Sequence, residues 1–128
     1  VRNINQLDNL LRTLLTNPTD RRMIVTALNI ATFDKCSLPP CHHTYTFTYF
    51  PNGRLDLECS MRSWDMALAY NIQLAALFLH ITCKLVGMKP GNVYLNCSNA
   101  HLYESSIESV ETMLSRDDFP APTLVLSN

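Results

Sequence analysis

A long apolar stretch from Ile72 to Met88 constrains the fold of this chain more than any other feature. It is interrupted by the polar side chains of Gln73, His80 and Lys84 and falls short of the roughly 20 apolar residues that cross a bilayer. A helix over residues 71–86 would be apolar on nearly every face, which is typical of a helix inside a core. We therefore expect a central buried helix and no membrane span.

Shorter patterns before and after this stretch predict further elements. Apolar residues at helical spacing run from Ile4 to a stop at Asn17-Pro18, and a second, outer helix is predicted at residues 105–115. Gly87 and Pro90 are expected to end the central helix. Strand patterns occupy residues 23–31, 44–50, 54–61, 92–97 and 123–126. The Asn-Gly pair at Asn52-Gly53 predicts a hairpin between the second and third of these strands.

Composition limits the classes to which the chain can belong. With 47% hydrophobic and 16% charged residues, the 128 residues fit one globular domain, residues 1–128. The net charge of −1, with scattered Lys and Arg, gives no electrostatic footprint for nucleic acid or an anionic membrane. Five cysteines without paired spacing indicate neither a disulfide framework nor a zinc site. We expect a protein of the reducing cytoplasm.

Cys41 is the best candidate for a nucleophile. Two prolines in Leu38-Pro39-Pro40-Cys41-His42 hold the backbone extended before it, so the cysteine is presented rigidly. A reactive thiolate needs positive or hydrogen-bonding neighbours, and His42 and His43 follow directly. Two alternatives stay open at this point: an ordinary loop cysteine, and a metal site, which is disfavoured because adjacent side chains seldom converge on one ion.

Two arginine motifs supply donors suited to a phosphate dianion. Arg21-Arg22 precedes Cys41, and Arg62-Ser63 follows it, offering guanidinium forks and a hydroxyl. Taken singly, each is more often a solvated surface charge. Their order relative to Cys41 is what favours a shared phosphate-binding function.

The order of several motifs resembles that of the thymidylate synthase family, and the similarity covers essentially the whole chain. The matching motifs are Asn17-Pro-Thr-Asp-Arg-Arg22, Leu38-Pro-Pro-Cys-His42, Arg62-Ser-Trp-Asp65, Tyr70-Asn-Ile72, Ala100-His-Leu-Tyr103 and Pro120-Ala-Pro122. The resemblance implies an α+β fold in which a bent mixed sheet packs against helices, with the central helix on the sheet. The family also includes the phage-type deoxypyrimidine hydroxymethylases.

The resemblance implies a role for Cys41 and for each arginine motif. Cys41 would attack C6 of deoxyuridine monophosphate (dUMP), which makes C5 a nucleophile towards the co-substrate methylenetetrahydrofolate, with no metal involved. Arg62 and Ser63 would bind the phosphate in the subunit's own site. Arg21 and Arg22 would reach the phosphate of the partner subunit, which implies a symmetric homodimer.

The resemblance also assigns residues to the base, the sugar and the folate. Asn71 would read the uracil edge, because an amide offers both a donor and an acceptor, whereas cytosine-reading relatives carry an aspartate there. His101 and Tyr103 would hold the sugar 3′-hydroxyl. Asp65 would meet the pterin ring of the folate. Each residue also has a plainer alternative, a half-buried polar side chain satisfied within the domain.

Several positions depart from the family pattern. The spacing between Asp65 and Asn71 is two residues shorter than usual, and Trp64 stands where a smaller residue is common. Met61 and Thr46 each replace a glutamine, and Ser98-Asn99 replaces Gly-Asp. The family's amino-terminal portion and carboxy-terminal closing segment do not match any part of this chain. We therefore expect a fragment of a longer protein.

Three functions stay open at the level of sequence. The first is C5 one-carbon transfer from methylenetetrahydrofolate to dUMP, completed by hydride as in thymidylate synthase. The second is completion by water, as in a hydroxymethylase. The motif Met61-Arg62-Ser63 favours the hydroxymethylases, whereas Leu38 to His42 and Asn71 favour the synthases. The third is a non-catalytic nucleotide-binding or structural homologue in a larger assembly. A phage-encoded protein that acts in the host cytoplasm is one expected source.

Overall fold

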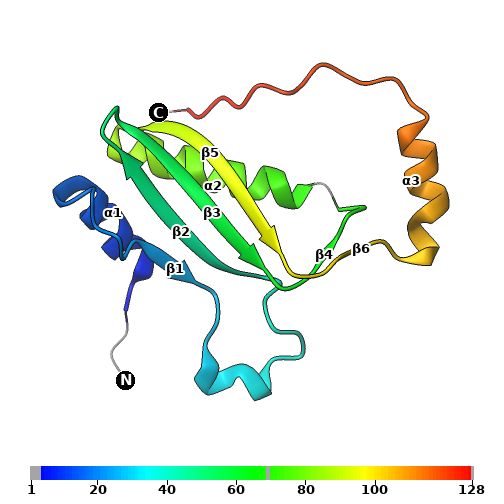
Figure 1. Cartoon of the computed structure of the whole chain (residues 1–128), viewed down its shortest axis with the longest axis horizontal. Coiled ribbons are helices and arrows are strands. Elements are labelled where there is room, and N and C mark those ends of the chain that lie inside the picture. The colour runs from blue at the N-terminus through cyan, green and yellow to red at the C-terminus, as the bar shows by residue number, and fades with distance from the viewer. Residues whose placement is uncertain (1–3, 69, 128) are drawn as a thin grey trace.

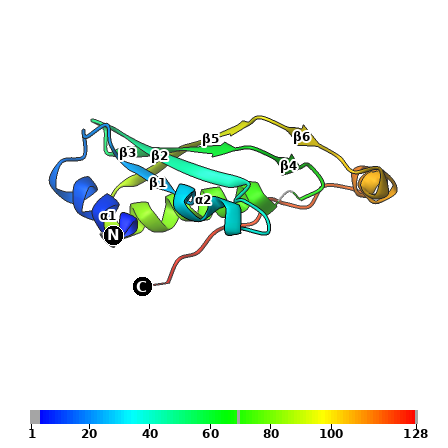
Figure 2. The ribbon, with the colours of Figure 1, turned by 90° about the horizontal axis from the view of Figure 1, so that it is seen from below.

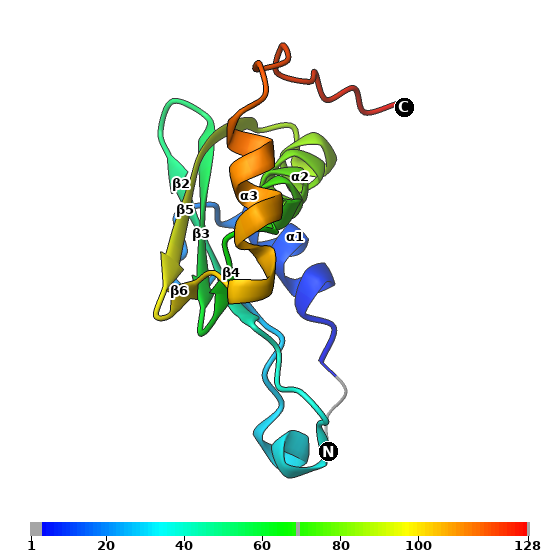
Figure 3. The same cartoon turned by 90° about the vertical axis from the view of Figure 1, so that its right-hand side faces the viewer.

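The computed structural model describes residues 4–68 and 70–127, which form a mixed sheet with helices on one face. In Figure 2 the sheet forms one layer, and helices α1 (Gln6–Thr16) and α2 (Tyr70–Val86) lie together beneath it. Figure 3 shows the opposite face of the sheet with no helix over it among the described residues. The predicted fold class, a mixed sheet packed against helices, is confirmed.

The main sheet has four strands in the order β1-β2-β3-β5 (Figure 1). Strands β1 (Ile24–Thr26), β2 (His42–Phe50) and β3 (Arg54–Met61) are antiparallel neighbours, whereas β3 and β5 (Lys89–Cys97) run parallel. The predicted hairpin between β2 and β3 is confirmed. Gly53 has a φ of +81°, a conformation that favours glycine, and its N–H donates to the carbonyl of Phe50 at 2.9 Å.

The core lies between the sheet and the two helices. Alternate residues of β2 and β3 point into it, including Phe47, Leu55 and Leu57, which are at most 2% exposed. The Phe78 ring of α2 meets the rings of Tyr45 and Phe47 edge-on, with both pairs of centroids 5.3 Å apart. Because only every second strand residue faces the helices, the other face of the sheet is left to polar side chains.

Helix α2 packs on the sheet as predicted, but it is buried along one face only. Ala75, Leu79 and Cys83 are buried against the strands, whereas Leu74 is 53% and Leu85 63% exposed. The expectation of burial on every face is therefore wrong for the described part of the chain. The pattern predicted the sheet contact correctly, because the inward stripe at spacings of four residues is fully apolar.

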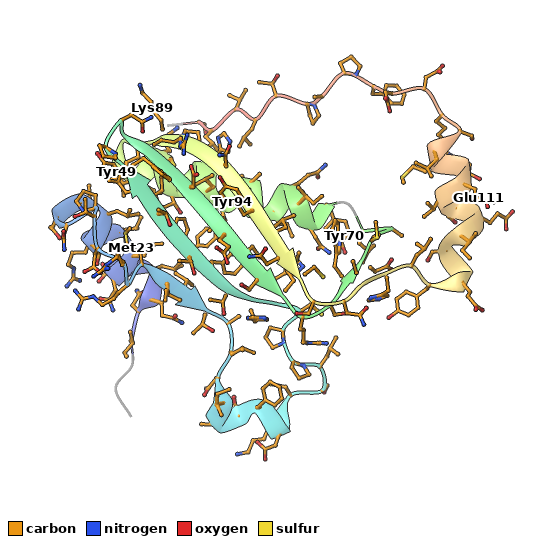
Figure 4. All side chains as sticks on the ribbon, in the orientation of Figure 1. Met23, Tyr49, Tyr70, Lys89, Tyr94 and Glu111 are labelled. Atoms are coloured by element: carbon orange, nitrogen blue, oxygen red, sulfur yellow. The ribbon has the colours of Figure 1, made fainter. Side chains whose placement is uncertain are left out.

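Helix α1 begins and ends where its sequence indicates. The side chain of Asn5 accepts a hydrogen bond from the Asp8 N–H at 3.1 Å, which caps the first turn, and Asn17 ends the helix before Pro18. Leu10 and Leu14 are buried against Met23, beside β1 in Figure 4. The strand predicted at residues 23–31 is shorter than expected, because a 3₁₀ helix, η1 (Ile30–Lys35), follows it.

Beyond the main sheet the chain becomes extended. Strands β4 (Trp64–Asp65) and β6 (Ala100–His101) form a short parallel pair, and η2 (Glu104–Ser106) leads into α3 (Ile107–Leu114), which lies apart from the sheet in Figure 1. The strand predicted at 123–126 is wrong, because those residues have no strand partner in the described chain. Gly87, with a φ of +69°, ends α2 as predicted, whereas Pro90 lies within β5.

None of the helices in residues 4–68 and 70–127 is both long enough and apolar enough to cross a membrane. The prediction of a single domain over residues 1–128 stays a prediction.

Candidate active site

Cys41 lies at the point where the chain enters β2. The hydrogen-bonded register of β2 and β3 slips between His42 and Thr44, so one additional residue is accommodated there. His43 occupies this bulge, and its Nδ1 lies 2.9 Å from Oγ1 of Thr44. Because the bulge bends the end of β2 and the two prolines precede it, the thiol of Cys41 is held at this end of the sheet, partly exposed.

Arg62 directly follows β3 and holds the Cys41 segment by three contacts. Its backbone N–H donates to the carbonyl of Cys41 at 3.0 Å, and its Nη2 donates to the carbonyl of Pro39 at 2.6 Å and to the Cys41 sulfur at 3.4 Å. Its buried Nε has no hydrogen-bond partner among the described residues. The structure therefore places a guanidinium beside the candidate nucleophile, with donor capacity still unused.

The β4–β6 pair brings Asp65 and His101 into register beside Arg62 and Ser63. Asp65 and His101 are direct Cα partners, and the carbonyl of His101 accepts from the Met66 N–H at 2.9 Å. The rings of His101 and Tyr103 meet edge-on with their centroids 5.0 Å apart. Asp65, which was predicted to contact the folate, and His101, which was predicted to contact the sugar, are thus neighbours, although they are 36 positions apart in the sequence.

Asn71 lies in the first turn of α2, next to Tyr70, which Figure 4 shows at the end of the sheet opposite Tyr49 and Lys89. Its N–H donates to the carbonyl of Leu68 at 3.4 Å. The same carbonyl accepts the indole N–H of Trp64 at 3.2 Å. The short connection from β4 to α2 is therefore closed by hydrogen bonds within itself.

Arg21 and Arg22 do not join the residues around Cys41 in this chain. They lie just before β1, and the pairing of Ile24 with Thr46 places them beside the half of β2 that is distant from Cys41. At about 3.3 Å per strand residue, this puts Arg22 roughly 20 Å from Cys41 along the sheet. In a single subunit they cannot share a ligand with Cys41.

The two arginines also differ in their partners. The guanidinium of Arg22 is bound by Asp20, with Nε and Nη2 donating to the carboxylate at 3.0 and 2.7 Å. These bonds lower the pKa of Asp20 from 3.8 to about 2 and raise that of Arg22. Arg21 forms no ion pair with the described residues and lines a hollow with Thr46 and Tyr49. Of the two, Arg21 is the more available to a phosphate.

Sequence reasoning missed two contributors to the arrangement. The carbonyl of Pro39 anchors Arg62, and a backbone acceptor leaves no signal in the residue type. The side chain of Asn99 lies 3.2 Å from Nδ1 of His101, and the polar pair Ser98-Asn99 in a turn was a usable signal for it. Trp64 was noted only as larger than the residue common at its position, whereas its indole N–H donates to the carbonyl of Leu68 in the loop that follows.

Two comparisons with known proteins bear on this arrangement. A sequence model described as thymidylate synthase matches residues 1–128. The chain is also 39% identical over 124 residues to the "Probable thymidylate synthase" of Escherichia phage T5. That match covers 95% of this chain and 44% of the relative, so the chain spans less than half the length of the curated relative it matches.

Proposed function

The chain belongs to the thymidylate synthase family, and from this premise we propose that it forms the nucleophile-bearing, nucleotide-binding part of a one-carbon transferase. Its substrate is dUMP, and its co-substrate is methylenetetrahydrofolate. The observation that carries the proposal is the contact between Arg62 and the Cys41 sulfur at 3.4 Å. It brings together, at one end of the sheet, the candidate nucleophile Cys41 and the residue proposed to bind the phosphate, Arg62.

In this proposal Cys41 opens the reaction. Its sulfur forms a bond to C6 of the uracil, and the electron pair of the C5–C6 double bond moves onto C5 and the neighbouring O4. C5 then bonds to the methylene carbon supplied by the folate. This bond forms as one of the two C–N bonds of the folate's bridging methylene breaks. When the proton on C5 leaves, the second C–N bond breaks, so the folate is released and C5 carries an exocyclic methylene. A hydride from the folate, or water in a hydroxymethylase, adds to this methylene, and the C5–C6 double bond re-forms as the sulfur–C6 bond breaks and the cysteine leaves. One difficult substitution is thus divided into easier steps.

The neighbouring residues position the nucleotide. Arg62 and Ser63 bind the phosphate, and Asn71 presents its amide to N3–H and O4 of the base. His101 and Tyr103 are held edge to edge, which fits a shared contact with the 3′-hydroxyl. Asp65 already accepts the N–H of Ala67 through Oδ1 at 3.0 Å, which leaves Oδ2 for the pterin ring of the folate.

We also propose that two copies pack through the sheet face that no helix covers. Arg21 and Arg22 lie roughly 20 Å along the sheet from Cys41, so they reach a phosphate only in another subunit. A two-fold axis through the middle of this face would bring the arginines of each copy towards the Cys41 end of its partner. Polar residues of that face, such as Thr46 and Glu58, would then become interface residues.

A hydroxymethylase is the second candidate, favoured by the connection between β4 and α2. This loop is short and carries Trp64, so the folate side of the site differs in shape from the family pattern. A change of shape there alters which nucleophile, hydride or water, reaches the C5 methylene. A non-catalytic homologue is the remaining alternative, and it predicts nucleotide binding without turnover.

The test is mass spectrometry of the nucleotide after the longest native form of the protein is mixed with dUMP and methylenetetrahydrofolate. The methylated nucleotide identifies a synthase, and the hydroxymethylated nucleotide identifies a hydroxymethylase. In a Cys41→Ser variant, we expect turnover to fall by at least about 1,000-fold while dUMP binding is kept. Turnover by Cys41→Ser equal to that of the wild type would refute the proposal.

The exposed Cys36 offers a matched control for the same experiment. A Cys36→Ser variant should keep full turnover, because in the described part of the chain this thiol hydrogen-bonds only to the carbonyl of Thr32. Unchanged dUMP with folded, nucleotide-bound wild-type protein would instead establish the non-catalytic homologue.

Mixing inactive variants tests the shared site. Cys41→Ser and Arg21→Ala subunits, each inactive or weak alone, should regain up to about a quarter of wild-type activity when mixed, because half the dimers are hybrids with one intact site. Activity no greater than the sum of the two separate variants would reject a shared site.

A further inference from the structure

The connection between β4 and α2 is organised around one backbone oxygen. The carbonyl of Leu68 accepts the indole N–H of Trp64 at 3.2 Å and the backbone N–H of Asn71 at 3.4 Å. A carbonyl oxygen has two lone pairs, so both donors can be accepted together. Trp64 and Asn71 are thereby linked through a single atom, although seven positions separate them.

The backbone of Trp64 is itself fixed on the short strand pair. Its N–H donates to the carbonyl of Asn99 at 2.9 Å, and it is the Cα partner of Ala100. The indole therefore reaches the loop from an anchored position on β4. A side chain that is anchored on the strand in this way can hold the loop in a defined position relative to the strand.

The rest of the connection is held by more local contacts. The Leu68 N–H donates to the carbonyl of Asp65 at 3.0 Å, which forms a tight turn, and the Asp65 carboxylate accepts from Ala67. Neither bond reaches the first turn of α2. Among the described residues, the Leu68 carbonyl is the point where a side chain of β4 meets the backbone of Asn71.

We propose that Trp64 is a positioning residue that sets the orientation of Asn71 towards the pyrimidine base. This inference rests on the proposed function, in which Asn71 reads the uracil edge. The tryptophan compensates for the short spacing between Asp65 and Asn71 by bracing the loop with a side chain. It acts on base discrimination through Leu68 and touches neither the phosphate nor the sulfur of Cys41.

The test is a Trp64→Phe variant, which keeps an aromatic ring and removes the indole N–H. Binding is measured by calorimetry with dUMP, with deoxycytidine monophosphate and with deoxyribose 5-phosphate, which lacks a base. We expect affinity for dUMP, and its preference over the cytidine nucleotide, to fall by about threefold to tenfold, the effect of one hydrogen bond. Affinity for deoxyribose 5-phosphate should stay unchanged.

Equal weakening for all three ligands would overturn the inference, because it would show that Trp64 only supports the fold of the site. Unchanged preference for dUMP would overturn it as well. Thr13→Val is the matched control, since it removes another side-chain bond to a carbonyl, that of Asn9 at 2.8 Å, on helix α1. It should change none of the three affinities.

Amide hydrogen exchange of the free protein separates this inference from the proposed function. Faster exchange of the Asn71 N–H in Trp64→Phe than in wild type supports the hold of Trp64 on Asn71, even if wild type binds no dUMP and the proposed function fails. Unchanged exchange at Asn71 overturns the inference whatever the protein binds.

Discussion

Strand β3 has an arginine at each end, and the two side chains have opposite kinds of partner. Arg54, at the hairpin end, forms a salt bridge to Asp56 with Nε 3.0 Å from Oδ1, and its guanidinium stacks 4.3 Å from the centre of the Phe50 ring. Arg62, at the other end, contacts the Pro39 carbonyl and the Cys41 sulfur and has no carboxylate within ion-pair distance in the described chain.

This difference separates an arginine that serves the fold from one that we propose binds a ligand. The charge of Arg54 is neutralised by Asp56, a side chain only 3% exposed that also accepts the Asn92 N–H at 3.0 Å. The guanidinium of Arg62 is oriented by neutral groups, and its charge is left uncompensated. This arrangement fits an arginine that binds an anionic ligand. For the two arginines of β3, an ion-pair partner within the chain therefore distinguishes the charge that serves the fold.

Among the changes that test this comparison, removing the charge of Arg62 should have the largest effect on function. We expect Arg62→Gln to lower kcat/KM for dUMP by about 100- to 1,000-fold, because both a phosphate ligand and the anchor of the Cys41 segment are lost. Steady-state kinetics measures the change. Arg54→Gln is the matched control on the same strand and should keep activity per folded molecule within about threefold.

Equal losses of activity in the two arginine variants would show that the arginines at the two ends of β3 do not differ in function. A thermal melt of each variant belongs with the kinetics, since it shows how much of the protein is folded at the assay temperature.

Neutralising Asp56 should have a smaller effect, on stability. We expect Asp56→Asn to lower the free energy of unfolding by about 1–3 kcal/mol, towards the lower end because Arg54 remains partly solvated. Urea denaturation monitors it. The backbone at Gly91 packs closely against the Asp56 carboxylate, because a Cβ on Gly91 would lie 2.0 Å from Oδ1 of Asp56.

Asp8→Asn provides the comparison for Asp56→Asn. It neutralises the exposed pair of Asp8 with Arg12 on helix α1, so we expect a change below about 0.5 kcal/mol. If both variants lose the same stability, burial of Asp56 does not set its contribution.

The smallest effect concerns the pair of Asp20 and Arg22, in which the arginine side chain is exposed. The pKa of Asp20 is lowered from 3.8 to about 2, so its pairing stabilises the folded state above pH 3.8 and is lost as the pH falls towards 2. Wild type should therefore be slightly more stable than Asp20→Asn at pH 5, and this difference should vanish near pH 2. Thermal melts across this range measure it. A difference that grows on acidification would contradict the assigned sign.

Local patterns were enough to predict much of the fold. The spacing of apolar residues predicted helices α1 and α2, and the Asn52-Gly53 pair predicted the hairpin of β2 and β3, because these elements are set by neighbouring residues. The pattern failed at residues 123–126, where apolar residues have no strand to pair with. It also failed for the outer face of α2, because burial depends on what lies against a helix.

The candidate site was predicted less completely. The motif order identified Cys41 and Arg62 as members of one site, and the structure brings the sulfur and guanidinium into contact. Ser63, Asn71, Tyr103 and the other predicted ligand contacts stay predictions. The Leu68 carbonyl that joins Trp64 to Asn71 could not be predicted, since a backbone acceptor is available at every residue.

The sequence by itself determined which residue types stand in which order, and with them the family and the local elements. Only the tertiary structure decided what surrounds each charge: Arg54 pairs with Asp56 and Arg22 with Asp20, whereas Arg62 meets only neutral groups among the described residues. The physical reason is that hydrogen bonds and ion pairs act over a few ångströms in space. Residues as distant in the chain as Pro39 and Arg62 become partners only when the strands between them have paired.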